Sequence, residues 1–105
     1  MAIVIGDIYP EKVKEHYGDG KKFGVDIIYI YQGEPGGIAQ AVGLCNDFVG
    51  GSPFVVYLGD NLLKGGIEKF VEEFEESKYD GMILLCKVKN PQRFGVAEFD
   101  KGGKL

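Results

Sequence analysis

Histidine and cysteine are scarce in this sequence, which contains one His and two Cys among 105 residues. A zinc site needs about four closely placed His, Cys or carboxylate ligands, so this composition excludes one built within the chain. Cys45 and Cys86 each lie in an apolar run. That setting favours two buried thiols in a reducing compartment, with a disulfide between them as the alternative.

Long apolar runs and an excess of basic charge are also absent. No segment approaches the roughly 20 apolar residues of a membrane-spanning helix. The start, MAIVIGDIYPEK, has no basic segment and only a short apolar run, so we expect no signal peptide. The net charge of −4 argues against a nucleic-acid surface, yet it allows a nucleotide held by backbone N–H groups and metal ions. We therefore expect a cytoplasmic chain that binds neither nucleic acid nor membrane.

Strand-like and helix-like patterns alternate along the chain. Apolar and β-branched runs predict strands at 3–5, 25–31, 54–58, 82–88 and 96–99. Helical spacing predicts helices that begin at Pro10, over 38–48 and from Ile67. This alternation predicts one α/β domain over residues 1–105, with a Rossmann-like, mostly parallel sheet and flanking helices. In such sheets, ligands bind beyond the carboxyl ends of the strands.

Polar residues and glycines occupy two of these predicted strand ends. Asp60 follows the run 54–58, which is continuously apolar like a strand buried on both faces. Its carboxylate there would suit Mg²⁺, or it would only cap a turn. Gln32 follows the run 25–31, where its amide would read the edge of a base or simply face solvent. Gly36 and Gly37 precede a helix whose free N–H groups suit an anion or a carbonyl, with a flexible loop as the alternative.

Several stretches together resemble the sugar-1-phosphate nucleotidylyltransferases, and in particular the glucose-1-phosphate thymidylyltransferases and their archaeal relatives. They are Gln32, PGGIAQA at 35–41, LGDN at 58–61 and RFGVAEFD at 93–100. YGDG at 17–20 with FGV at 23–25 is also similar to the segment that precedes the base-reading strand in that family. The likeness extends over essentially the whole chain, in the family's order.

The resemblance implies a nucleotide-diphospho-sugar transferase fold and its reaction. Such enzymes make an NDP-sugar and pyrophosphate from dTTP or UTP and a sugar 1-phosphate such as glucose 1-phosphate. By the same resemblance, Gln32 pairs with the pyrimidine base and Gly37 offers it a backbone N–H. Asp60 binds the catalytic Mg²⁺. Gly95 lines the sugar pocket, next to Phe94, which stands where a Tyr is common.

Part of the family's pattern is missing from the sequence. The triphosphate loop Gly-x-Gly-Thr-Arg-Leu-x-Pro does not occur, and the family's Glu-Glu-Lys-Pro motif would fall just after Leu105. The resemblance therefore implies a truncated fold, an internal piece of a larger enzyme, and we do not expect catalysis by this chain alone. The missing first strand would lie between 3–5 and 54–58. Its absence would leave strand edges with unpaired backbone N–H and C=O groups. Such edges pair with strands of other chains, so we expect self-association.

Two other readings remain open at this point. The chain could be a non-catalytic nucleotide-binding or interaction module with the same fold. It could also be a receiver-like phosphoacceptor domain with Asp60 as acceptor. That class requires an acidic pair on the first strand, whereas Asp7 is single. It also requires a Lys after a late strand, whereas Lys87 and Lys89 lie within or just after theirs.

Overall fold

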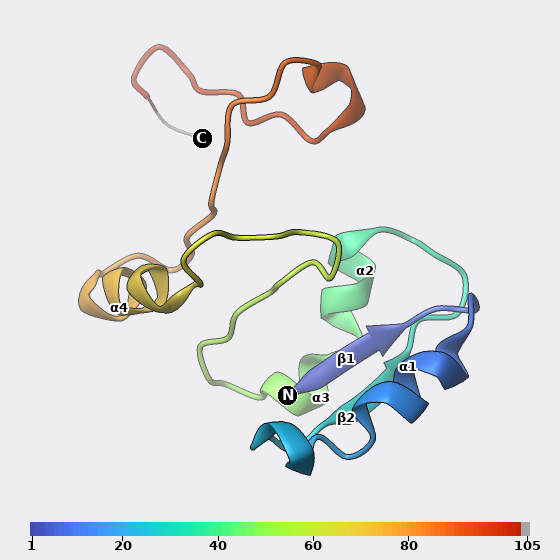
Figure 1. Cartoon of the computed structure of the whole chain (residues 1–105). Helices are drawn as coiled ribbons and strands as arrows, with labels where there is room; N and C mark the ends of the chain where they lie inside the picture. Colours follow the sequence, from blue (N-terminus) through green and yellow to red (C-terminus); the bar gives the residue numbers. More distant parts are fainter. Residues whose placement is uncertain (104–105) are drawn as a thin grey trace. The chain divides into compact units, whose positions relative to one another are not determined.

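The computed structural model describes residues 1–103, apart from the side chain of Arg93 (Figure 1). The chain forms two compact units, Met1–Asn61 and a second unit that begins at Leu62. The predicted α/β class is confirmed, since a parallel sheet and helices are both present. Among the residues described, no helix has the length and apolar character needed to cross a bilayer.

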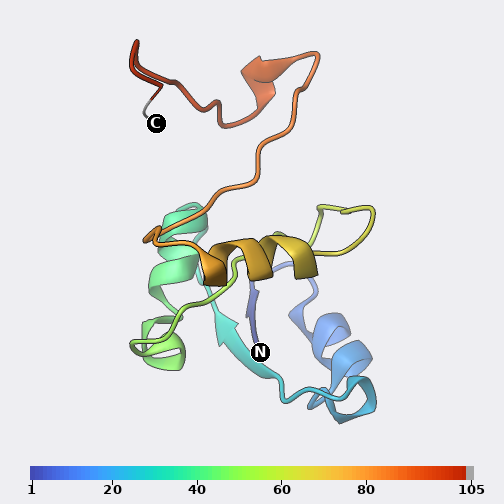
Figure 2. The same ribbon diagram turned by 90° about the vertical axis from the view of Figure 1, so that its left-hand side faces the viewer.

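The first unit is built on two parallel strands. β1 (Ala2–Ile5) pairs with β2 (Ile28–Tyr31), with Ala2 opposite Ile28 and Ile5 opposite Tyr31. Figure 2 shows the two strands side by side and running in the same direction. Because parallel strands end at the same edge, the residues that follow Ile5 and Tyr31 emerge together there.

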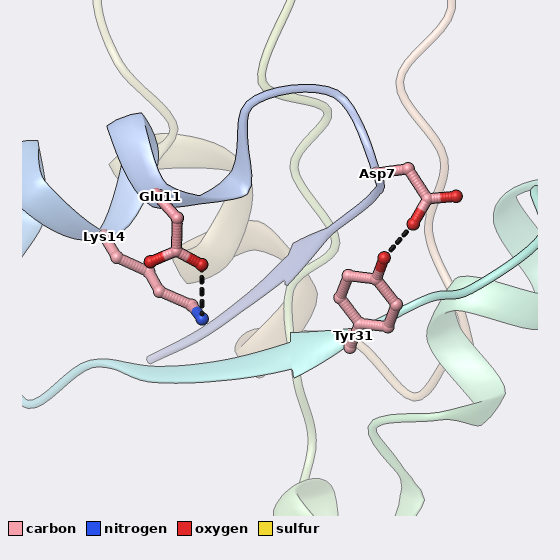
Figure 3. Close-up of polar contacts among 4 residues, drawn as sticks. All are labelled: Asp7, Glu11, Lys14 and Tyr31. Carbon is pink, nitrogen blue, oxygen red and sulfur yellow. Dashed lines mark hydrogen bonds and ion pairs between the residues drawn. The ribbon is translucent and has the colours of Figure 1, made fainter.

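Helix α1 (Pro10–Tyr17) connects the two strands, followed by the short helix η1 (Lys21–Phe23). Pro10 occupies the start of α1, where a missing N–H costs nothing. Glu11 in the first turn complements the helix dipole and forms an ion pair of 3.4 Å with Lys14 (Figure 3). Both side chains are exposed, so we attribute only a few tenths of a kcal/mol to this pair.

The core of the first unit is small and depends on one close approach. Ile5 and Ile27 are the only buried hydrophobic residues in the described part of the chain. Ile27 packs directly against Gly20, where an added Cβ would lie 2.6 Å from Cγ1 of Ile27 and 2.5 Å from the carbonyl oxygen of Val25. Gly20 also has a φ of +84°, which glycine adopts without strain. Glycine is therefore required twice over at this position.

The helix predicted over 38–48 is interrupted. The structure has α2 (Ile38–Gly43) and α3 (Asn46–Val49) in its place. Gly43 is the last residue of α2. The backbone N–H of Cys45 then donates a hydrogen bond of 3.0 Å to the carbonyl oxygen of Val42, which forms a tight turn. Glycine is a poor helix former, which accounts for the break that apolar spacing alone did not reveal.

In the second unit, α4 (Glu68–Glu76) confirms the helix predicted from Ile67. Phe70, Val71 and Phe74 lie half-buried on one side of it. Phe70 lines an open hollow of about 490 Å³ together with residues of the segment that follows, including Tyr79 and Met82. The short helix η2 (Pro91–Arg93) forms the turn predicted at Pro91.

The strands predicted at 54–58, 82–88 and 96–99 are wrong for the described residues, and the strand predicted from residue 25 begins only at Ile28. A strand exists only where a neighbour completes its hydrogen-bond ladder, and within 1–103 the sheet contains β1 and β2 alone. The side chains expected inside a sheet are exposed as a result, with Val55 at 58 % and Leu85 at 57 %. The thiols are likewise not both buried, since Cys86 is exposed and Cys45 half-buried.

Candidate functional site

Gln32 lies at the carboxyl end of β2 and is held there by the sheet. Its backbone N–H donates to the carbonyl oxygen of Ile5 at 2.9 Å, which continues the ladder one step beyond the strand. Its side chain is half-buried. The position predicted for the base-reading residue is therefore anchored by main-chain pairing rather than by a loop.

The loop after Gln32 turns the chain back over that side chain. Gly33 and Gly37 have φ values of +69° and +94°, a region that favours glycine. The turn brings the carbonyl oxygen of Gly37 to 3.4 Å from Nε2 of Gln32. The loop is thus defined by backbone geometry and a side-chain contact, which argues against the alternative of a loop without fixed structure.

Gln40, in the first turn of α2, closes the arrangement. Its Oε1 accepts a hydrogen bond of 2.6 Å from the backbone N–H of Gly36 and another of 3.1 Å from Nε2 of Gln32. A Cβ on Gly36 would approach the same oxygen to 2.7 Å, so a side chain there would displace the Gln40 amide. Oε1 of Gln40 therefore connects Gln32, the loop at Gly36 and α2 by hydrogen bonds.

Two hydrogen-bonding groups on this loop remain unused. Within residues 1–103, Oε1 of Gln32 accepts no hydrogen bond, and the backbone N–H of Gly37 donates none. No atom lies within 4 Å of the Cβ that Gly37 lacks, so the space above its backbone is open. The loop therefore offers one acceptor and one donor to a ligand.

Asp60 lies in an exposed turn at the end of the first unit. The backbone N–H of Asn61 donates to Leu58 at 3.0 Å, and the hydroxyl of Tyr57 donates to the carbonyl oxygen of Asn61 at 2.8 Å. The turn is closed without the Asp60 side chain, which has no hydrogen bond or ion pair in the described part of the chain. The alternative of a turn-capping role is therefore not supported, and the carboxylate remains available.

No group of three or more His, Cys, Asp or Glu side chains in the described region could hold a metal ion. A cation at Asp60 would therefore need further ligands beyond the His, Cys, Asp and Glu side chains of residues 1–103. Mg²⁺ is commonly bound in this manner, by one or two carboxylates plus substrate phosphates. The carboxylate of Asp60 is the type of oxygen ligand that such an ion takes.

Gly95 belongs to the second unit. It lines an open hollow of about 360 Å³ whose other lining residues are Ile83, Leu85, Val96, Ala97 and Glu98. No atom lies within 4 Å of an ideal Cβ at Gly95. The structure thus brings Gln32 and Gly37 into contact and places Asp60 in the same unit, while Gly95 lies in the other.

Gln40 lies within the PGGIAQA stretch at 35–41, but the sequence did not predict a role for it. A signal was present, because Gln at the third position of a helix often reaches back to a backbone N–H before the helix. Here that N–H belongs to Gly36, one residue before the N-cap Gly37.

Comparison with known proteins adds independent evidence. The family model described as "Nucleotidyl transferase" matches residues 1–105. The low-salt glycan biosynthesis nucleotidyltransferase Agl11 of Haloferax volcanii is 44% identical over 105 residues, covering 100% of this chain and 29% of that protein. A glucose-1-phosphate thymidylyltransferase of Streptomyces antibioticus is 42% identical over 106 residues, covering 100% of this chain and 30% of that protein.

A solved structure is similar as well. A crystal structure of a Bacillus anthracis protein assigned as a glucose-1-phosphate thymidylyltransferase, in complex with sucrose, superposes with a TM-score of 0.85. The sequence identity is 44%, and the match covers 95% of this chain and 41% of that one. The chain spans 29–30% of the length of the two curated relatives named above. With a family match over its whole length, the chain belongs to the nucleotidyl transferase family.

Proposed function

We propose that this chain supplies the base-binding and metal-binding part of a nucleotidyltransferase. The enzyme would make an NDP-sugar and pyrophosphate from dTTP or UTP and a sugar 1-phosphate such as glucose 1-phosphate. The observation that supports this most is the free acceptor and donor pair on Gln32 and Gly37. Membership of the nucleotidyl transferase family and relatives named glucose-1-phosphate thymidylyltransferase point to the same reaction.

Base binding follows from the two unused groups. The imide edge of thymine or uracil presents an N3–H donor beside carbonyl acceptors. Oε1 of Gln32 would accept from that N3–H, and the N–H of Gly37 would donate to a neighbouring carbonyl oxygen. The open space above Gly37 allows the base to approach its backbone, where a side chain would stand in the way.

Metal binding is assigned to Asp60 because its carboxylate is exposed and unengaged among residues 1–103. Asp60 would hold Mg²⁺ together with phosphate oxygens of the bound nucleotide. When bound, the ion neutralises the charge that develops on the phosphates. The sugar is assigned to the hollow beside Gly95, where the missing side chain leaves room for a ring.

The reaction would proceed as an in-line displacement. An oxygen of the sugar 1-phosphate attacks the α-phosphorus, a new P–O bond forms, and the bond to the β-phosphate oxygen breaks to release pyrophosphate. No covalent enzyme intermediate is required, so the contribution of Gln32, Gly37 and Asp60 is to bind and orient the nucleotide. The proposal implies a cytoplasmic protein, since nucleoside triphosphates are its substrates.

Calorimetric titration of the chain with dTTP in the presence of Mg²⁺ tests this function. Gln32→Leu should weaken binding about tenfold, because the base donor loses its acceptor. Gln92→Leu, at an exposed Gln of the second unit, is the matched control and should bind like the wild type. Equal binding by both variants would overturn the proposed base site. Release of pyrophosphate on addition of glucose 1-phosphate would overturn the alternative, a non-catalytic nucleotide-binding module.

We also propose self-association through a second copy of the chain at the open edge of β1. Ile5 directs its carbonyl oxygen toward β2, so by alternation Ala2 and Val4 direct their backbone N–H and C=O groups to the other edge. No strand in the described region pairs with that edge. Unpaired edges of this kind recruit other strands.

Sedimentation velocity at micromolar concentrations tests this association. The wild type should sediment as a dimer or larger species. Val4→Pro should give a monomer with an intact sheet, because proline removes only the N–H that faces away from β2. A monomeric wild type at tens of micromolar would contradict this proposal and leave the base site untouched.

A further inference from the structure

The hydrogen bonds around Gln32 determine more than its position. They also decide which end of its amide faces a ligand, and therefore which bases the site accepts. The inference that follows rests on the proposed function, since it concerns the same base site. It gives a role to Gln40, which lies eight positions along the chain and is not itself placed to meet the base.

The orientation of Gln40 is fixed by a backbone group. The N–H of Gly36 can only donate, so the atom 2.6 Å from it must be the amide oxygen of Gln40 and not its nitrogen. That oxygen also faces the side chain of Gln32 at 3.1 Å. Gln32 must therefore turn its NH₂ group toward Gln40 in order to donate.

A second backbone group enforces the same orientation of Gln32. The carbonyl oxygen of Gly37 can only accept, and it lies 3.4 Å from Nε2 of Gln32. Reversing the Gln32 amide would place its oxygen against two acceptors, the Gly37 carbonyl and Oε1 of Gln40. The amide is thus held with Nε2 toward Gln40 and the Gly37 carbonyl, which leaves Oε1 as its end without a partner among residues 1–103.

A locked acceptor discriminates between pyrimidines. Thymine and uracil carry a proton on N3 that Oε1 of Gln32 can accept. Cytosine carries a lone pair on N3, which would repel that oxygen. Cytosine could satisfy both protein groups in one way only. Its amino group would donate to Oε1 of Gln32, and its N3 would accept from the N–H of Gly37. Because these two atoms lie one position further along the edge of the base, the ring and the ribose would be displaced. A Gln free to rotate would lose this distinction, since its NH₂ could donate to N3 of cytosine.

We propose that Gln40 is a positioning residue for nucleotide choice. It holds the Gln32 amide with its oxygen toward the base, so that the site selects thymine or uracil nucleotides over cytosine nucleotides. Gln40 acts through Gln32 and the Gly36 backbone, without contact to the base.

Two substitutions separate this role from a general structural one. Gln40→Leu removes the acceptor at 3.1 Å and leaves the Gln32 amide only the longer contact of 3.4 Å with the Gly37 carbonyl, so its orientation is held less firmly. Gln40→Glu retains an acceptor for both Gly36 and Gln32, since a carboxylate only accepts. A residue that merely supported the loop would lower the affinity for all pyrimidine nucleotides equally. A residue that orients Gln32 changes their ratio instead.

The first measurement is the ratio of dissociation constants for dCTP and dTTP, each with Mg²⁺, by calorimetry on the 105-residue chain. The wild type and Gln40→Glu should prefer dTTP about tenfold or more. Gln40→Leu should reduce that ratio about fivefold or more. An unchanged ratio in Gln40→Leu overturns the inference.

The second measurement needs no nucleotide. In ¹H–¹⁵N spectra of the free chain, the Gln32 side-chain NH₂ should show the shift dispersion and slowed exchange of a hydrogen-bonded amide. Gln40→Leu should reduce both, because only the longer contact with the Gly37 carbonyl remains, and Gln40→Glu should preserve them. A Gln32 signal that is the same in all three proteins overturns the inference. Locked Gln32 signals with no binding of either nucleotide would instead overturn the proposed function.

Discussion

The hydroxyl of Tyr31 donates a hydrogen bond to Oδ1 of Asp7, which joins the ends of the two parallel strands (Figure 3). Tyr31 is the last residue of β2, and Asp7 follows the end of β1 by two positions. The contact lies immediately before Gln32 in the chain. It therefore secures the edge of the sheet from which the candidate base site emerges.

Removing this contact should loosen that edge. We expect Tyr31→Phe to lower the free energy of unfolding by about 0.5–1 kcal/mol, since the bond is exposed but has a carboxyl oxygen as its acceptor. Tyr79→Phe is the control, because no hydrogen bond to the Tyr79 hydroxyl is present within residues 1–103. Urea unfolding followed by circular dichroism measures both. Equal effects of the two changes would show that the Tyr31–Asp7 bond contributes nothing.

Gly20 offers a sharper test of the core. Gly20→Ala should destabilise the first unit by about 2–4 kcal/mol, because the new methyl group adds crowding against Ile27 to the strain of a positive φ. Gly24 has a similar φ of +75° with open space around its Cβ position. Gly24→Ala should therefore cost only the strain, about 1 kcal/mol. Similar thermal midpoints for the two variants would refute the close approach of Ile27 to Gly20.

The proposed metal role of Asp60 predicts a specific loss. Asp60→Asn should remove most of the dependence of dTTP binding on Mg²⁺, because the carboxylate that anchors the ion becomes neutral. In EDTA, the variant and the wild type should bind dTTP equally. Asp80→Asn, at an exposed carboxylate of the second unit, should retain the full Mg²⁺ effect. Retention of that effect in Asp60→Asn would remove Asp60 from the metal site.

The two thiols should react at different rates. Cys86 is exposed, whereas Cys45 is half-buried and lies 3.5 Å from the carbonyl oxygen of Ala41. An aromatic disulfide reagent should label Cys86 in a fast phase and Cys45 in a slow one, since reactivity follows access. Cys86→Ala should eliminate the fast phase. A single slow phase for both thiols would mean that residues 82–88 are covered in solution.

Local signals in the sequence predicted the elements that need no distant partner. Pro10 at a helix start and the apolar spacing of Phe70, Val71 and Phe74 were sufficient for α1 and α4. The pairing of β1 with β2 also agrees with the short apolar run at 3–5. These elements are specified by residues a few positions apart.

The strands predicted at 54–58 and 82–88 were wrong, because composition alone does not show whether a strand has a neighbour to pair with. The runs 54–58 and 82–88 have strand-like composition, yet no ladder partner faces them in the described part of the chain. Gln32 and Gly37 were predicted from the resemblance, and the structure places them in contact. The role of Gln40 depends on which atoms face each other across a folded loop, which no spacing rule reveals.

The most direct test of the base site is a ¹H–¹⁵N titration of the wild-type chain with dTTP and Mg²⁺. We expect saturable shifts at the backbone N–H of Gly37, the side-chain NH₂ of Gln32 and the backbone around Asp60. Signals of α4 should remain unchanged. A titration that leaves the Gln32 and Gly37 signals unmoved, or that shifts those of α4 in their place, would overturn the proposed base site.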